Sequence, residues 1–186
     1  MAKTAGSEKR QKIREENFAD LDLWSGDNEK GWFRAPRTLP YIMELLSQKH
    51  LSQKFDLGKV YLELLSRHVD GGVIEMKDES THSYAAGYVG TRAVRTWQER
   101  MAKLEETGFI RSVQIGNQKY RYVALVHPTV VVKQLYDAGK IDENWYRTYR
   151  DRQIEVKDEL FEEREKKKNL KLVPPVELPK SSAAAK

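Results

Sequence analysis

Residues 80–110, STHSYAAGYVGTRAVRTWQERMAKLEETGFI, predict two helices joined by a glycine-containing turn. The second helix has an apolar stripe whose members recur at steps of three and four residues, namely Val94, Trp97, Met101 and Leu104. Such spacing places side chains on one face of a helix. We expect this helix to begin near Thr91 and to end at Gly108, after which the chain becomes a strand.

The residues that follow predict a β-hairpin. Residues 109–115 and 119–126 are rich in β-branched and aromatic side chains, and they flank the compact turn Gly116-Asn117. Upstream, residues 73–76 predict a short strand that can pair with this hairpin. The expected fold class is therefore mainly α with a small β-sheet.

This order of elements resembles the winged helix-turn-helix superfamily of DNA-binding domains, over roughly residues 56–126. The resemblance rests on a first helix at 57–69, the small pair Ala85-Ala86, the start of the longer helix at Gly90-Thr91, and the hairpin. It implies a winged helix-turn-helix with additional N- and C-terminal helices. It also implies that the helix from Thr91 is the recognition helix and that the hairpin is the wing.

The face of this helix opposite its apolar stripe carries polar side chains. The candidates for DNA contacts there are Thr91, Arg92, Arg95, Thr96, Glu99 and Lys103. An arginine can donate two hydrogen bonds to guanine O6 and N7, and a threonine can contact a thymine methyl or a phosphate. Glu99 could accept from cytosine N4 or hold an arginine in place. The alternative is an ordinary solvated helix face.

The hairpin supplies a second set of candidates, which are expected to contact phosphates: Arg111, Gln118, Lys119 and Arg121. Because side chains alternate along a strand, we expect Lys119 and Arg121 to share one face and Tyr120 and Tyr122 to share the other. The tyrosines are then expected to pack in the core or at the sheet edge.

Composition narrows the classes of function. The chain has 186 residues, a formal net charge of +5 and no cysteine, so it has no disulfide scaffold and no thiolate metal site. Its four histidines lack ligand spacing, and no apolar run approaches the length of a membrane span. It also lacks a phosphate-binding glycine loop, a nucleophile elbow and an HExxH motif. We therefore expect a cytoplasmic protein that has no enzymatic activity, no cofactor and no metal.

Four regions are expected along the chain. Residues 1–17 predict a disordered basic arm, 18–140 the DNA-binding domain with its N-terminal extension, 141–169 a C-terminal helix, and 170–186 a flexible tail. Arg10 and Arg14 in the arm are candidates for contacts with DNA or with a partner protein such as an ATPase. The alternative is an arm that only increases solubility.

The C-terminal region predicts one long helix. From Asp142, a good N-cap, to about Lys168 there is no glycine or proline, and a continuous helix would be roughly 40 Å long. Trp145, Tyr149 and Val156 lie on one stripe of it, which could hold a homodimer together. A solvated helix is the alternative, and the helix around 42–46 is the second candidate for a dimer interface.

These features predict a protein that binds double-stranded DNA sequence-specifically, as a bacterial-type transcriptional regulator. One alternative is DNA segregation or replication initiation on a plasmid-like element, which the basic arm suggests. An alternative of another class is a winged helix that binds proteins without DNA readout.

Overall fold

The computed structural model describes residues 8, 12–13, 15–17, 31, 33–52, 55–68 and 72–168. The chain divides into two compact units, residues 1–34 and residues 35–186. The predicted flexible tail, 170–186, lies outside the described residues.

The first unit contains helical residues. Residues 12–13 and 15–17 are helical, Lys12 pairs with Glu16 at 3.7 Å, and Asn17 Nδ2 donates to the Ile13 carbonyl at 3.0 Å. These i to i+4 contacts support a helical turn at the described residues, and the disorder of the arm as a whole stays a prediction. Arg10 and Arg14, the proposed contacts of the arm, lie outside the described residues.

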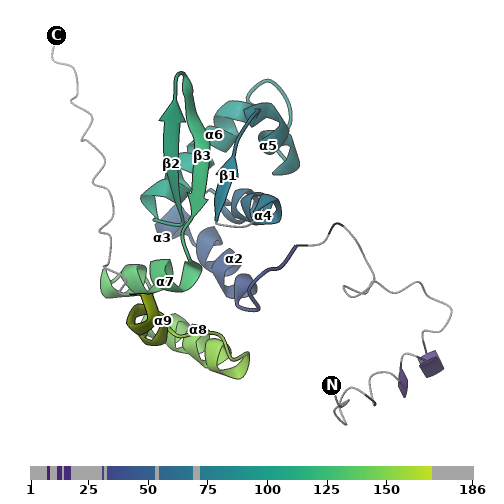
Figure 1. The fold of residues 1–186 in the computed structure, drawn as a ribbon, viewed down its shortest axis with the longest axis vertical. Helices are drawn as coiled ribbons and strands as arrows, with labels where there is room; N and C mark the ends of the chain where they lie inside the picture. Colours follow the sequence, from purple (N-terminus) through teal and green to yellow (C-terminus); the bar gives the residue numbers. More distant parts are fainter. Residues whose placement is uncertain are drawn as a thin grey trace. The chain divides into compact units, whose positions relative to one another are not determined.

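The second unit is mainly helical and contains one small antiparallel sheet (Figure 1). Its elements are α2 (Leu39–Ser47), α3 (Lys49–Ser52), α4 (Gly58–Arg67), β1 (Val73–Glu75), α5 (Glu79–Ala85), α6 (Ala93–Glu106), β2 (Ile110–Ile115), β3 (Gln118–Leu125), α7 (Pro128–Asp137), α8 (Glu143–Glu155) and α9 (Phe161–Lys168). The predicted class, mainly α with a small β-sheet, is confirmed.

The sheet has the strand order β1-β3-β2, and both pairings are antiparallel. Ile74 and Ser112 both lie opposite Val123, on either side of β3. Nearer the hairpin tip the register shifts, so that residues 119–121 of β3 lie opposite the single residue Gln114 of β2.

This register shift corrects the predicted alternation of side chains in β3. Tyr120 is buried whereas Tyr122 is only half-buried, and Lys119 is exposed whereas Arg121 is half-buried. Extra residues in one strand re-aim the side chains around them, which the two-residue period of a regular strand does not anticipate.

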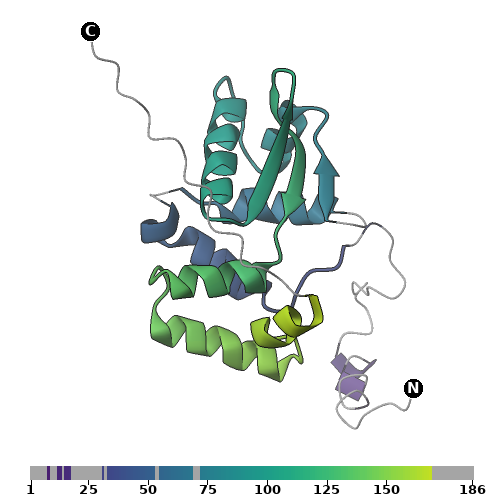
Figure 2. The same ribbon diagram turned by 60° about the vertical axis from the view of Figure 1, so that its left-hand side comes forward.

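The core lies between the sheet and helices α4, α5 and α6, which lie on one side of it (Figure 2). Trp97, Met101 and Leu104 of the predicted stripe are fully buried, and Val94 is half-buried. Trp97 packs edge-on against Tyr120 of β3, with ring centroids 5.6 Å apart. Periodic burial of this kind fixes which face of α6 remains open to solvent.

The predicted single helix from Asp142 to Lys168 is wrong. Asp142 does cap the N-terminus, accepting from the Trp145 amide at 3.0 Å, but α8 ends at Glu155. Lys157 then takes a left-handed conformation, with φ of 56°, and α9 begins at Phe161, which is buried. Left-handed residues commonly end helices but are usually glycine, so the sequence carries no sign of this reversal.

The stripe proposed for dimerisation packs within the chain. The ring of Tyr149 is 1% exposed and stacks on Trp145, while Tyr41 of α2 packs edge-on against both rings. Trp145 also donates from Nε1 to Glu44 Oε2 of α2, and Val156 is half-buried at the end of α8.

The second candidate dimer interface, the helix around 42–46, also packs within the chain. The apolar residues of α2, namely Ile42, Leu45 and Leu46, are fully buried. Neither stripe is free to hold a second copy, because α2 and α8 are packed against each other and the core. This corrects the assignment of Trp145, Tyr149 and Val156 to a dimer interface.

We predict that Tyr149→Ala destabilises the protein by about 3 kcal/mol, because truncating a buried aromatic side chain leaves a cavity. Arg147→Ala, on the exposed side of the same helix, should change the free energy of unfolding by less than about 0.5 kcal/mol. Urea unfolding of both variants measures this. A dimeric wild type and a stably folded, monomeric Tyr149→Ala protein would instead restore the interface assignment.

Candidate nucleic-acid interface

The start of α5 is fixed by the carboxylate of Asp78. It accepts hydrogen bonds from the backbone amides of Ser80 at 3.0 Å and Thr81 at 3.2 Å, and from both of their hydroxyls. The hydrogen bonds from Thr81 and Ser80 favour the ionised carboxylate and lower the pKa of Asp78 to about 2. This cap sets where α5 begins.

Two glycines shape the turn between α5 and α6. Gly87 and Gly90 both have φ of 86°, and a side chain at either position would meet no atom within 4 Å. Glycine is therefore favoured at both positions by the left-handed backbone and not by a lack of space. Ala86, the last residue before the turn, is buried, so the turn is held against the core.

The open face of α6 begins with cationic side chains. Thr91 and Arg92 are exposed, and the side chain of Arg95 is 81% exposed. Arg92 occupies the N-cap without a side-chain hydrogen bond, and the first turn has no acidic residue. Ala93 N donates to the Gly90 carbonyl at 3.1 Å. No side chain caps this end, so the positive end of the helix dipole is left to attract an anion.

Glu99 serves to position the arginines around it. Its Oε1 lies 3.4 Å from Arg95 Nε, and its Oε2 lies 3.3 Å from Arg100 Nη1. Arg100 itself is mostly buried and lies over the ring of Phe55, 4.4 Å from its centroid. Thr96 is half-buried on the same helix. The geometry favours the second of the two roles considered for Glu99.

Lys103 does not belong to this open face. Its side chain is only 8% exposed, and its Nζ lies 2.8 Å from Glu106 Oε1. Thr107, just beyond the end of α6, is buried as well. Lys103 itself is covered by protein, so we correct its assignment as a DNA contact.

The hairpin residues proposed for phosphate contacts divide into two groups. Lys119 is exposed, and no carboxylate partner for it occurs in the described part of the chain. Arg121 pairs with Glu75 of β1, Arg111 donates to the Glu105 carbonyl at 3.2 Å, and Gln118 donates to the Lys77 carbonyl at 3.3 Å. These three tie neighbouring elements together and are half-buried, so Lys119 is the most open of the four, and the phosphate contacts stay predictions.

The start of α6 and the tip of the hairpin lie at the same end of the domain, as both views show (Figures 1 and 2). They do so because α6 and β2 have nearly the same length. A tight turn at Gly108 reverses the chain, and both α6, with 14 residues, and β2, with 6 residues, extend about 20 Å. Arg92 and Arg95 therefore share one end of the domain with Lys119.

Two exposed side chains near this end were missed by sequence reasoning. Tyr84 of α5 and Val89 of the following turn are each 74% exposed. The available signal was their position, because Val89 lies beside Gly90 in the turn and Tyr84 lies at the end of the helix that precedes the turn.

A buried polar cluster behind α5 was also missed. His82 Nδ1 lies 2.9 Å from Glu63 Oε1 of α4, and Arg67 Nε also contacts this oxygen. His82 stacks on Trp97, with ring centroids 6.2 Å apart. These contacts hold α4, α5 and α6 together, so that His82 has a structural role.

Comparison with known proteins finds no matching family model, no matching curated protein and no matching solved structure. Over the residues that the structure describes, no helix has both the length and the apolar character needed to cross a membrane.

We predict that Asp78→Ala lowers the melting temperature at neutral pH, because both capped amides lose their acceptor. The folded-state pKa of about 2 lies below the ordinary value of 3.8. The ionised cap therefore contributes its full stabilisation of the fold above pH 3.8, and this contribution is lost as the pH falls through about 2.

Thermal melts of the wild type and the variant across this pH range measure the effect, with Asp151→Ala on the exposed side of α8 as the control. The difference in melting temperature between the wild type and Asp78→Ala should disappear at low pH. A gap of constant size at every pH would show that the carboxylate charge has no part in the cap.

Proposed function

We propose that this protein is a winged helix-turn-helix protein that binds double-stranded DNA sequence-specifically, as a transcriptional regulator. The order α4-β1-α5-α6-β2-β3 supports this proposal. The observation that carries it is the division of α6, with Arg92 and Arg95 open to solvent at its start and Trp97 fully buried on its other side.

This division suits the major groove. The groove is about 12 Å wide, which matches the diameter of about 10 to 12 Å of a helix with its side chains. An inserted α6 would present Arg92 and Arg95 to base edges, where each guanidinium can donate two hydrogen bonds to a guanine. Glu99 would hold Arg95 in an extended position, which reduces the entropy lost on binding.

The hairpin and the helix end supply contacts of another kind. Lys119 at the hairpin would neutralise a backbone phosphate beside the groove, and the uncapped first turn of α6 would accept a second phosphate. These contacts give affinity and fix the register without reading sequence. Specificity is assigned to the α6 arginines alone.

A second candidate function is protein binding through the same end of the domain. Tyr84 and Val89 favour it, because large exposed apolar side chains are typical of interaction surfaces. The two functions differ in salt dependence. Duplex binding that weakens steeply with added salt in a gel shift supports DNA recognition, and the absence of any duplex binding at low salt favours the protein partner.

We predict that Arg95→Ala weakens specific binding by about 1 to 3 kcal/mol, the value of one bidentate arginine–guanine contact. The probe is a duplex selected from a random-sequence library by the wild-type protein, with affinity measured by fluorescence anisotropy. Arg147→Ala on α8 removes an equal charge from an exposed site and serves as the matched control. Equal affinities for all three proteins would exclude the groove assignment.

We predict that Lys119 and Arg121 differ in their effect on salt dependence. Lys119→Ala should flatten the log-log dependence of affinity on salt by about 0.9, the value for one phosphate contact. Arg121→Ala should leave the slope nearly unchanged, because this guanidinium is already paired with Glu75. Affinities across a salt series measure both slopes, and the reverse order would mean that DNA breaks the Arg121 pair.

A further inference from the structure

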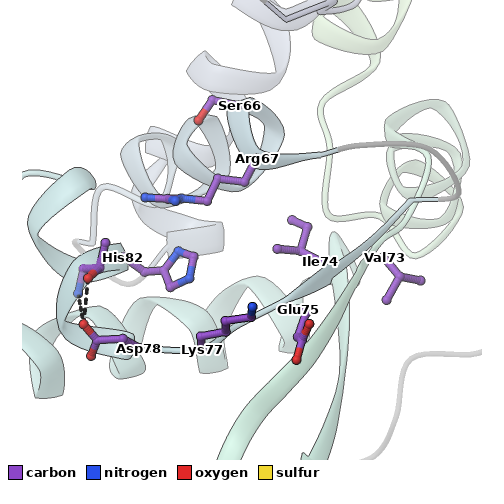
Figure 3. Close-up of a pocket in the computed structure, with 9 residues that line it drawn as sticks. Ser66, Arg67, Val73, Ile74, Glu75, Lys77, Asp78 and His82 are labelled. Atoms are coloured by element: carbon purple, nitrogen blue, oxygen red, sulfur yellow. Dashed lines mark hydrogen bonds between the residues drawn. The ribbon is translucent and has the colours of Figure 1, made fainter. Parts of the chain in front are cut away.

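A pocket of about 550 Å³ lies between the end of α4, the strand β1 and the start of α5 (Figure 3). Ile74 of β1 is buried while Val73 and Glu75 are exposed, yet all three line the pocket. Side chains on opposite faces of a strand can line one pocket only along the strand's edge. The pocket therefore follows the outer edge of β1, on the side away from β3.

This edge carries backbone groups that have no partner among the residues that the structure describes. Met76 N donates to the Arg121 carbonyl, and Leu125 N donates to the Gly72 carbonyl. In an antiparallel ladder such pairs alternate, so the amide and carbonyl of Ile74 also face β3. Those of Val73 and Glu75 must then point outward, where they form a ready template for another strand.

The side chains around the pocket have spare donors but few spare acceptors. Asp78 already accepts from Ser80 and Thr81, and Glu75 is paired with Arg121. Arg67 donates from Nε to Glu63 Oε1, so its two terminal nitrogens can donate to another group. Lys77 is exposed. In Figure 3 the Arg67 side chain extends from the end of α4 toward His82, and Lys77 lies across the same space on the β1 side.

From this geometry we propose that the outer edge of β1 is a docking site for an extended peptide of a partner protein, one that carries a carboxylate side chain. The peptide would pair with the backbone of Val73 and Glu75 and direct its carboxylate toward Arg67 and Lys77. This inference goes beyond DNA binding and does not depend on it, since the site shares no residue with the proposed DNA surface.

Hydrogen-bond donors rather than net charge identify the occupant, because the pocket lining holds Glu75 and Asp78 as well as Arg67 and Lys77. A second copy of β1 would bring its own Lys77 to the edge, and cationic side chains at an edge oppose pairing with a like-charged strand. An acidic strand would meet the terminal nitrogens of Arg67 and the Nζ of Lys77, for which no hydrogen-bond partner occurs among the described residues. Strand addition supplies affinity through main-chain bonds, and the pocket selects the side chain.

The test is a titration of the isotope-labelled full chain with a short peptide of alternating valine and glutamate, followed by amide NMR. The comparison probes are the same peptide with lysine in place of glutamate, and sodium glutamate at equal carboxylate concentration. We expect the acidic peptide to shift the amide signals of Val73 and Glu75 and to slow their hydrogen exchange, and we expect neither comparison probe to do so.

Two variants separate the backbone from the charge. Glu75→Pro removes an outward amide, and the extended Ile74 before it suits a proline. Glu75→Ala loses the same pair with Arg121 but keeps the amide, so it is the matched control. We expect Glu75→Pro to abolish binding and Glu75→Ala to retain it. Lys77→Glu, at an exposed position, should weaken binding about tenfold, the effect of one charge-assisted hydrogen bond.

Three results would overturn the proposal. The first is an acidic peptide that leaves Val73 and Glu75 unshifted. The second is sodium glutamate producing the same shifts, which would identify a site for free anions. The third is a set of shifts centred on Arg95 and Lys119, which would place the peptide on the DNA surface. If Glu75→Pro does not fold, Lys77→Glu decides the outcome, because an unchanged affinity there removes the charge recognition.

Discussion

The burial of Trp97 is the interaction on which the rest of the structure depends. Its indole is fully buried, packs edge-on against Tyr120 of β3 and stacks on His82 of α5. His82 in turn contacts the buried Glu63 of α4, so one side chain connects three helices and the sheet. Truncating a buried tryptophan typically costs about 3 to 5 kcal/mol, out of a total domain stability of about 5 to 15 kcal/mol.

The orientation of α6 follows from this anchor. With Trp97, Met101 and Leu104 turned inward, the start of the helix can present only its arginine-bearing side to solvent. Lys103 in the last turn is buried although it was expected on the polar side of the helix. The surface proposed for DNA is thus limited to the first half of α6, the turn before it and the hairpin tip. The free edge of β1 is a separate surface, and it would remain accessible if DNA occupied the first.

Features governed by neighbours in sequence were predictable. The periodicity of α6, the Gly116-Asn117 hairpin and the Asp142 cap all depend on residues a few positions apart, and each is present. Features governed by distant residues were not. The pairing of Arg121 with Glu75 decides whether that arginine is open, and the two lie 46 positions apart. Likewise, periodicity identified the stripe of Tyr149 but left open whether it was solvated or packed against a second copy, whereas it packs against α2 of the same chain.

The most direct measurement of the central claim is a map of the residues that DNA touches. The labelled full chain would be titrated with a duplex selected from a random library, and amide shifts would be followed by NMR. Perturbations should concentrate in residues 87–99 and 116–119, the first part of α6 with its preceding turn and the hairpin tip. Perturbations concentrated in α7 to α9, with the signals of Arg92 and Arg95 unmoved, would contradict it.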